Sequence, residues 1–133
     1  MSAIEFPEYL RQIQDTLNEV ISAGQALSLE LQADQRSSTQ GFIAGILYFA
    51  DGTELHFREY VNLSAPEPRQ MYAYHYQDAD GQLIFRYDNA VHRPPLSARE
   101  HKHTRDSVVV ILPPTLEQVI DEIMHDQGLA GTS

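Results

Sequence analysis

The tripeptide Ala-Asp-Gly occurs twice in this chain, in "YFADGTEL" and in "YQDADGQL", each time between two strand-like runs. A three-residue loop that closes with a left-handed glycine joins two antiparallel strands. The repeats therefore predict two β-hairpins, in which Phe49 pairs with Thr53 and Asp78 pairs with Gln82. The four strands are expected over about 41–49, 53–63, 70–78 and 82–88.

The segments outside these hairpins add two helices and two further strands. An apolar stripe at helical spacing predicts a helix over about 7–23, and alternating leucines predict a strand over 27–32. The apolar run in 107–114 predicts a buried strand, and a capping box at 115–118 begins a second helix. The chain is thus predicted to be one α+β domain over 1–133. It has a single antiparallel sheet of about six strands, with the N-terminal and C-terminal helices packed on one face.

Composition narrows the classes of function. The net charge of −10 argues against a protein whose whole surface attracts nucleic acid. Segment 86–105 is the exception, with a local balance of +3, which suits either an anionic ligand or a charged, solvated loop. The chain has no cysteine, no apolar run long enough to span a membrane and no signal peptide, so we expect a cytoplasmic protein without membrane association.

The hairpin registers place polar side chains in informative positions. In the first hairpin Glu59 ends an otherwise apolar row, so it is either a candidate acid or base, or a strand-end residue that turns outward or pairs with an arginine. In the second hairpin the register opposes Tyr74 to Arg86, and Tyr72 to Asp88. Tyrosines and an arginine on one face can stack on bases and bind phosphate, although aromatic residues also fit any pleated sheet. The same register puts His75 on the other face with Phe85 and Tyr87, where we expect a core histidine.

The connection after Asp88 is about 18 residues long and shows no regular pattern. Segments of this length inside compact domains are usually functional or disordered. His101 and His103 have the spacing of a metal chelate, to which His92 or Asp88 could add a ligand. Without a metal or other cofactor, the same imidazoles can take and give protons at a phosphate. The residues leave both uses open.

Motifs in residues 55–105 resemble the TumE-like family of bacterial toxins. The pattern combines a strand glutamate, Tyr-x-Tyr-His-Tyr, a glycine turn, Arg-Tyr-Asp-Asn, a histidine and His-x-His. The resemblance implies the toxin component of a type II toxin–antitoxin module, whose partner is a helix-turn-helix antitoxin encoded nearby. The matching residues are Glu59, Tyr72, Tyr74, His75, Tyr76, Arg86, Tyr87, Asp88, Asn89, His92, His101 and His103.

Two functions follow from these residues. The first is a ribonuclease or nucleotide-acting enzyme, with a metal site undecided and no cofactor expected. Its catalytic residues are predicted as His101, His103, Arg86 and Glu59, and its substrate-binding residues as Asp88, Asn89, Tyr74, His92 and Lys102. The alternative is a non-catalytic module that docks a protein partner through the Tyr/Arg sheet face and the basic loop.

Overall fold

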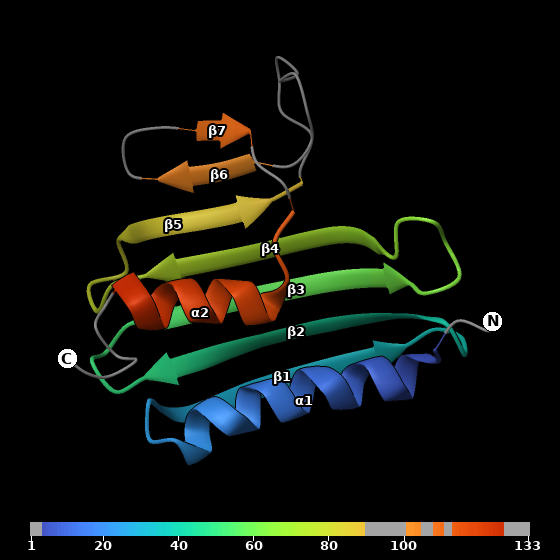
Figure 1. The fold of residues 1–133 in the computed structure, drawn as a ribbon, viewed down its shortest axis with the longest axis horizontal. Coiled ribbons are helices and arrows are strands. Elements are labelled where there is room, and N and C mark those ends of the chain that lie inside the picture. The colour runs from blue at the N-terminus through green and yellow to red at the C-terminus, as the bar shows by residue number, and fades with distance from the viewer. Residues whose placement is uncertain (1–3, 90–100, 105–107, 111–112, 127–133) are drawn as a thin grey trace.

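The computed structural model describes residues 4–89, 101–104, 108–110 and 113–126. Within these residues one antiparallel sheet carries seven strands, which lie side by side in chain order (Figure 1). Helix α1 (Phe6–Ser22) precedes the sheet and helix α2 (Leu116–Asp126) follows it. The strands are β1 (Ala26–Gln35), β2 (Gln40–Phe49), β3 (Glu54–Asn62), β4 (Arg69–Gln77), β5 (Leu83–Asp88), β6 (His101–Thr104) and β7 (Val108–Val110).

The predicted α+β architecture is confirmed, because both helices pack on the same face of one antiparallel sheet and share its core (Figure 1). Strand β6 corrects the expectation that residues 89–106 lack regular structure. Its sequence His-Lys-His-Thr shows no apolar alternation, so periodicity could not reveal it. The strand is held instead by backbone pairing with β5 and β7 on either side.

Helix α1 begins and ends where its boundary residues predict, and α2 begins at its predicted capping box. Helix α1 has Pro7 in its first turn and ends just before Gly24, whose φ is +79°. The capping box of α2 is formed: the Gln118 N–H donates to Thr115 Oγ1 at 3.1 Å, and the Thr115 N–H donates to Gln118 Oε1 at 2.9 Å. In the part of the chain that the structure describes, no helix is long and apolar enough to cross a membrane.

The two faces of the sheet differ in character. The helix-covered face is the buried one, and Ile43, Leu47, Leu55 and Phe57 form its centre. The opposite face, which we call the open face, is not covered by either described helix (Figure 1). It is formed by Glu30, Gln32, Ala44, Ile46, His56, Arg58, Ala73, His75, Arg86 and Asp88.

The first hairpin has the predicted register. The Phe49 N–H donates to the Thr53 carbonyl at 3.0 Å, and Ile43 lies opposite Glu59. Glu59 is 2 % exposed, so it points into the core and the alternative of an outward turn is wrong.

The second hairpin begins as predicted and then departs from the expected register. The Asp78 N–H donates to the Gln82 carbonyl at 2.9 Å, but a β-bulge follows, in which Ile84 is the extra residue. A shift of one residue exchanges the two faces of a strand. Arg86 therefore lies opposite His75 instead of Tyr74.

The bulge overturns two predictions. Asp88 lies opposite Ala73 and not Tyr72, so the tyrosines do not share a face with Arg86 and Asp88. His75 lies on the open face, and not with Phe85 and Tyr87 on the core side. Tyr72, Tyr74 and Tyr76 are 2 % exposed or less, so these three tyrosines do not form the exposed Tyr/Arg surface expected for docking a partner.

The position of α1 depends on a glycine in β2. The Phe6 ring lies against Gly41, and a Cβ atom built there would overlap the ring. Phe6 itself is 1 % exposed, so the ring has no space into which it could move. The absence of a side chain at Gly41 thus lets the first turn of α1 approach the sheet.

We expect Gly41→Ala to lower the free energy of unfolding by about 1–3 kcal/mol, because overpacking forces a buried ring to shift. Urea denaturation measures the loss. In a double-mutant cycle with Phe6→Leu, the two losses should be less than additive, because the smaller side chain makes room for the methyl group. Additive losses would show that the ring does not limit this position.

Candidate functional site

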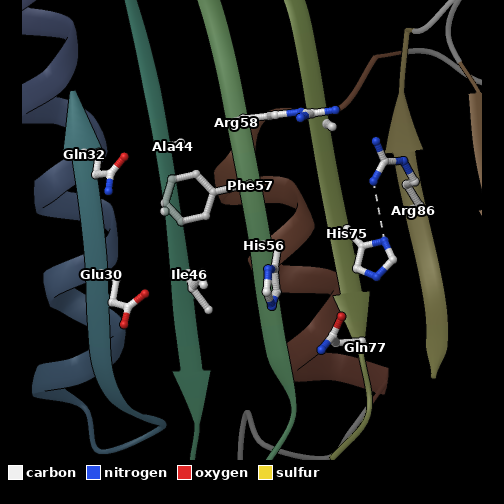
Figure 2. A pocket seen from close by; sticks show the side chains of 12 residues that line it. Glu30, Gln32, Ala44, Ile46, His56, Phe57, Arg58, His75, Gln77 and Arg86 are labelled. Atoms are coloured by element: carbon white, nitrogen blue, oxygen red, sulfur yellow. Dashed lines mark hydrogen bonds between the residues drawn. The ribbon is translucent and has the colours of Figure 1, made fainter. Parts of the chain in front are cut away.

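The open face holds a shallow groove of about 520 Å³ that runs across β1 to β5. Figure 2 shows its polar side chains standing on neighbouring strands of the sheet. A groove of this size is within the range that binds small-molecule ligands. Its polar lining includes Glu30, Gln32, His56, Arg58, His75 and Arg86.

One carboxylate organises the β5–β6 end of this face. Arg86 Nε donates to Asp88 Oδ2 at 2.8 Å, and His103 Nε2 lies 3.2 Å from the same oxygen. The Asp88 side chain is only 5 % exposed, whereas those of Arg86 and His103 are 29 % and 19 % exposed. A buried charge needs such partners. Asp88 therefore fixes the positions of an arginine and a histidine that both reach the solvent.

A second histidine lies on the other side of the arginine. Arg86 Nη1 is 3.5 Å from His75 Nδ1, and because the guanidinium can only donate, the imidazole nitrogen accepts (Figure 2). Burial lowers the pKa of His75, and the charges of Arg86 and His56 lower it further, against a hydrogen bond with Gln77. His75 is therefore an uncharged proton acceptor at neutral pH.

The structure brings together some of the predicted site residues. Because the chain must return to the sheet after Asp88, at least one of the three loop histidines is expected within reach of Arg86, Asp88 or Glu59, and His103 meets this expectation at Asp88. His101 belongs to β6, where its backbone pairs with Asp88. His92 lies outside the described residues, and so does any metal set that includes it. Among the side chains that the structure describes, no three His, Asp or Glu groups lie close enough to hold a metal ion.

His75, Arg86, Asp88 and His103 form a row across β4, β5 and β6 on the open face. Glu59 and Tyr74 lie on the helix-covered face, away from this row. The Tyr74 hydroxyl donates to Glu59 Oε2 at 2.6 Å, and the Tyr9 hydroxyl of α1 donates to Oε1. Arg69 donates to the Tyr74 oxygen at 2.9 Å and to the Pro114 carbonyl ahead of α2. Burial, followed by the charge of Glu59, raises the pKa of Tyr74 well above its ordinary value. This network joins both helices to the sheet.

Lys102 also faces the helices. Its ammonium donates to Glu122 Oε2 at 2.8 Å and lies 5.1 Å from the centre of the Tyr87 ring. The Tyr87 hydroxyl donates to the other oxygen of Glu122 at 2.6 Å. Lys102 therefore anchors β6 to α2.

Asn89 continues the pairing of β4 beyond the end of β5. The Tyr72 N–H donates to Asn89 Oδ1 at 3.1 Å, and Asn89 Nδ2 donates to the Gln70 carbonyl at 3.3 Å. With its side chain 6 % exposed and occupied by backbone groups, Asn89 shapes the turn out of the sheet.

Sequence reasoning missed His75 and Arg58 as members of the groove. His75 was assigned to the core because the bulge at Ile84 was not foreseen. Arg58 was not singled out, although alternation in the first hairpin, which was predicted correctly, already placed it on the face opposite Glu59.

The chain was then compared with known proteins. A family model described as Toxin TumE matches residues 17–128. The chain belongs to the TumE toxin family. The match includes every described strand and α2, and it confirms the resemblance carried by the histidine and tyrosine motifs. Membership makes the protein the toxin of a toxin–antitoxin module, which implies an antitoxin partner. Comparisons with curated proteins and with solved structures gave no match.

We expect Glu59→Gln to lower the free energy of unfolding by about 1–3 kcal/mol, because an amide cannot accept from both Tyr9 and Tyr74 or balance the charge of Arg69. Urea denaturation provides the measurement. The matched control is Glu8→Gln, whose carboxylate pairs only with Arg11 on the surface, and which should cost about 0.5 kcal/mol or less. A Glu59→Gln protein of normal stability that no longer arrests growth would instead favour the predicted catalytic role.

His75 also predicts a pH dependence. Its folded-state pKa lies below the unfolded value of about 6.5, so the unfolded chain binds more protons between these two values. Stability should therefore decrease as the pH falls from about 6.5 through the lower folded pKa. His75→Gln should remove this part of the decrease, measured as the difference in denaturation midpoint between parent and variant at each pH. The exposed His125→Gln is the control, and an unchanged profile in His75→Gln would contradict the assignment.

Proposed function

We propose that this toxin is a ribonuclease or a nucleotide-acting enzyme whose reaction takes place on the open face. The observation that carries the proposal is the Asp88 carboxylate that holds both Arg86 and His103, with His75 on the far side of the arginine. His75 and His103 lie directly opposite Arg86 on the two neighbouring strands. Because adjacent strands are about 4.8 Å apart, the two imidazoles flank one cation across roughly 10 Å of sheet.

This arrangement suits transfer of a phosphodiester to its own ribose. A base takes the proton of the 2′-hydroxyl, and the oxygen attacks the neighbouring phosphorus. An acid then protonates the 5′-oxygen as its bond to phosphorus breaks, which leaves a 2′,3′-cyclic phosphate and a 5′-hydroxyl. Neither water nor a metal is consumed, and one proton acceptor, one proton donor and one charge stabiliser suffice.

The described residues divide these roles among themselves. His75 is neutral and acts as the base through Nδ1, which becomes free to take the proton when Arg86 turns from it to the phosphate. His103 acts as the acid, positioned by Asp88 as a carboxylate positions the imidazole in other hydrolytic sites. Arg86 faces both imidazoles and stabilises the charge that develops on the phosphate oxygens. His101, in the same strand as His103, stays a candidate for the second proton transfer, and His92 a candidate for substrate binding.

The remaining predicted residues are assigned to support of the fold. Glu59 and Tyr74 are buried in the network that joins the helices to the sheet. Asn89 pairs with backbone groups of β4, and Lys102 pairs with α2. The four residues influence the site through the position of its strands, and we do not assign them contacts with substrate.

The proposal extends to partner and place of action. A toxin that cuts RNA acts in the cytoplasm, and the family implies an antitoxin that neutralises it there. In keeping with the motif resemblance, we propose a helix-turn-helix antitoxin.

The test is growth arrest on induced expression of the variants His75→Gln, His103→Gln and His101→Ala, together with cleavage of RNA by the purified proteins. Loss of a proton-transfer group should lower the rate about 10²–10⁴-fold. His103→Gln and His75→Gln are therefore expected to abolish growth arrest while the melting temperature and antitoxin binding persist. His125→Gln, on the outer surface of α2, should arrest growth as the parent does.

Two results would lead to other mechanisms. If both His75→Gln and His103→Gln fold and arrest growth fully, the row is not catalytic. If a chelator lowers the melting temperature of the parent but not of His101→Ala, a bound metal is the better explanation for the histidine strand.

A further inference from the structure

Arg58 is a charged residue on the open face that the catalytic row does not use. It lies on β3 between two alanines, Ala44 on β2 and Ala73 on β4. Its side chain is exposed, and it makes no hydrogen bond or ion pair with any residue that the structure describes. An arginine fork without a carboxylate, in a chain of net charge −10, is available for a ligand.

The small neighbours of Arg58 determine its direction. Figure 2 shows the guanidinium lying across β4 toward Arg86. Ala73 is the β4 residue directly opposite Arg58, and it is 4 % exposed although it is on the open face. A larger side chain at this position would block the path, so Ala73 is what allows two guanidinium groups on different strands to approach one place.

The charges around the guanidinium groups of Arg58 and Arg86 favour the binding of an anion. Arg58, Arg86 and the imidazoles of His56, His75 and His103 belong to four adjacent strands, and Asp88 is the carboxylate buried among them. The nearest other carboxylates are engaged or distant: Glu54 pairs with His56 at 2.9 Å, and Glu30 lies on β1 at the other side of the groove. Guanidinium groups that face each other repel unless an anion lies between them.

We infer that Arg58 and Arg86 together bind one phosphate of a single-stranded nucleic acid and present it to His75 and His103. The inference rests on the proposed function and names its substrate class. Guanidinium forks match phosphate geometry and commonly bind it through two hydrogen bonds. The groove of about 520 Å³ leaves room beside the phosphate for a nucleoside, which can rest on Ile46 and His56.

The test measures binding without cleavage. The probe is a fluorescent single-stranded tetranucleotide without 2′-hydroxyls, which cannot undergo the proposed reaction, and anisotropy gives its Kd. Loss of one charged contact should weaken binding about tenfold to hundredfold in Arg58→Ala, with an intermediate effect in Arg58→Lys. Arg11→Ala is the matched control, because it removes the same charge from α1, on the helix-covered side, where Arg11 pairs with Glu8.

The salt dependence adds a second readout. For single strands the slope of log K against log salt changes by about 0.7 for each phosphate contact, so Arg58→Ala should flatten the slope by about that amount and Arg11→Ala should not. Failure of the parent to bind the probe would overturn the inference, and so would equal binding by parent and Arg58→Ala. Equal binding combined with a weakened antitoxin complex would identify Arg58 as a docking residue for an acidic partner segment instead.

The binding experiment can fail or succeed independently of the test of the proposed reaction. If Arg58→Ala loses the probe while His75→Gln and His103→Gln still arrest growth, the phosphate subsite stands and the catalytic row does not. If Arg58→Ala binds normally while the histidine variants are inactive, the reaction stands and this subsite does not. Thermal melting confirms that each variant is folded, which is expected because Arg58 is exposed.

Discussion

The β-bulge at Ile84 determines which side of the sheet carries the charged row, because one extra residue in β5 turns every later side chain of that strand over. With the bulge, Phe85 and Tyr87 enter the core beneath the helices, and Arg86 and Asp88 emerge next to His75 and His103. Without it, two aromatic rings would be in water and an ion pair would be inside. The hydrophobic effect on Phe85 and Tyr87 thus holds the polar row in place.

The protein uses ionisable groups in two ways, according to the face on which they lie. On the helix-covered face the buried Glu59 and the partly exposed Glu122 accept hydrogen bonds from tyrosines, and each also lies near a cation, so both charges are satisfied by the fold. On the open face Asp88 is satisfied in the same way, but its partners Arg86 and His103 are partly exposed. In the second arrangement Arg86 lines the groove of the open face, where a ligand could reach it.

The sequence predicts those parts of the structure that depend on residues close together in the chain, and it fails for parts that depend on distant packing. The Ala-Asp-Gly turns, the capping box at Thr115 and the apolar stripes are local, and they predicted both helices, their packing on one face and every described strand except β6. The bulge has no such local signal. It results from the packing of Phe85 and Tyr87 against the core, and no turn residue in the sequence predicts it. The face of His75 therefore could not be predicted. The approach of some loop histidine to this strand end could be, because the chain must return to the sheet, although the sequence did not identify it as His103.

The contact of Lys102 with α2 affects when, during synthesis, the row on the open face reaches its final arrangement. The strand that carries His103 pairs with β5 and β7 and is also anchored through Lys102 to Glu122 of α2, which follows all the described strands in the chain. A chain still emerging from the ribosome without α2 therefore lacks one of the contacts that position its histidine strand. The row on the open face reaches its final arrangement only after α2 has been made, so the nascent toxin first carries these side chains without that support.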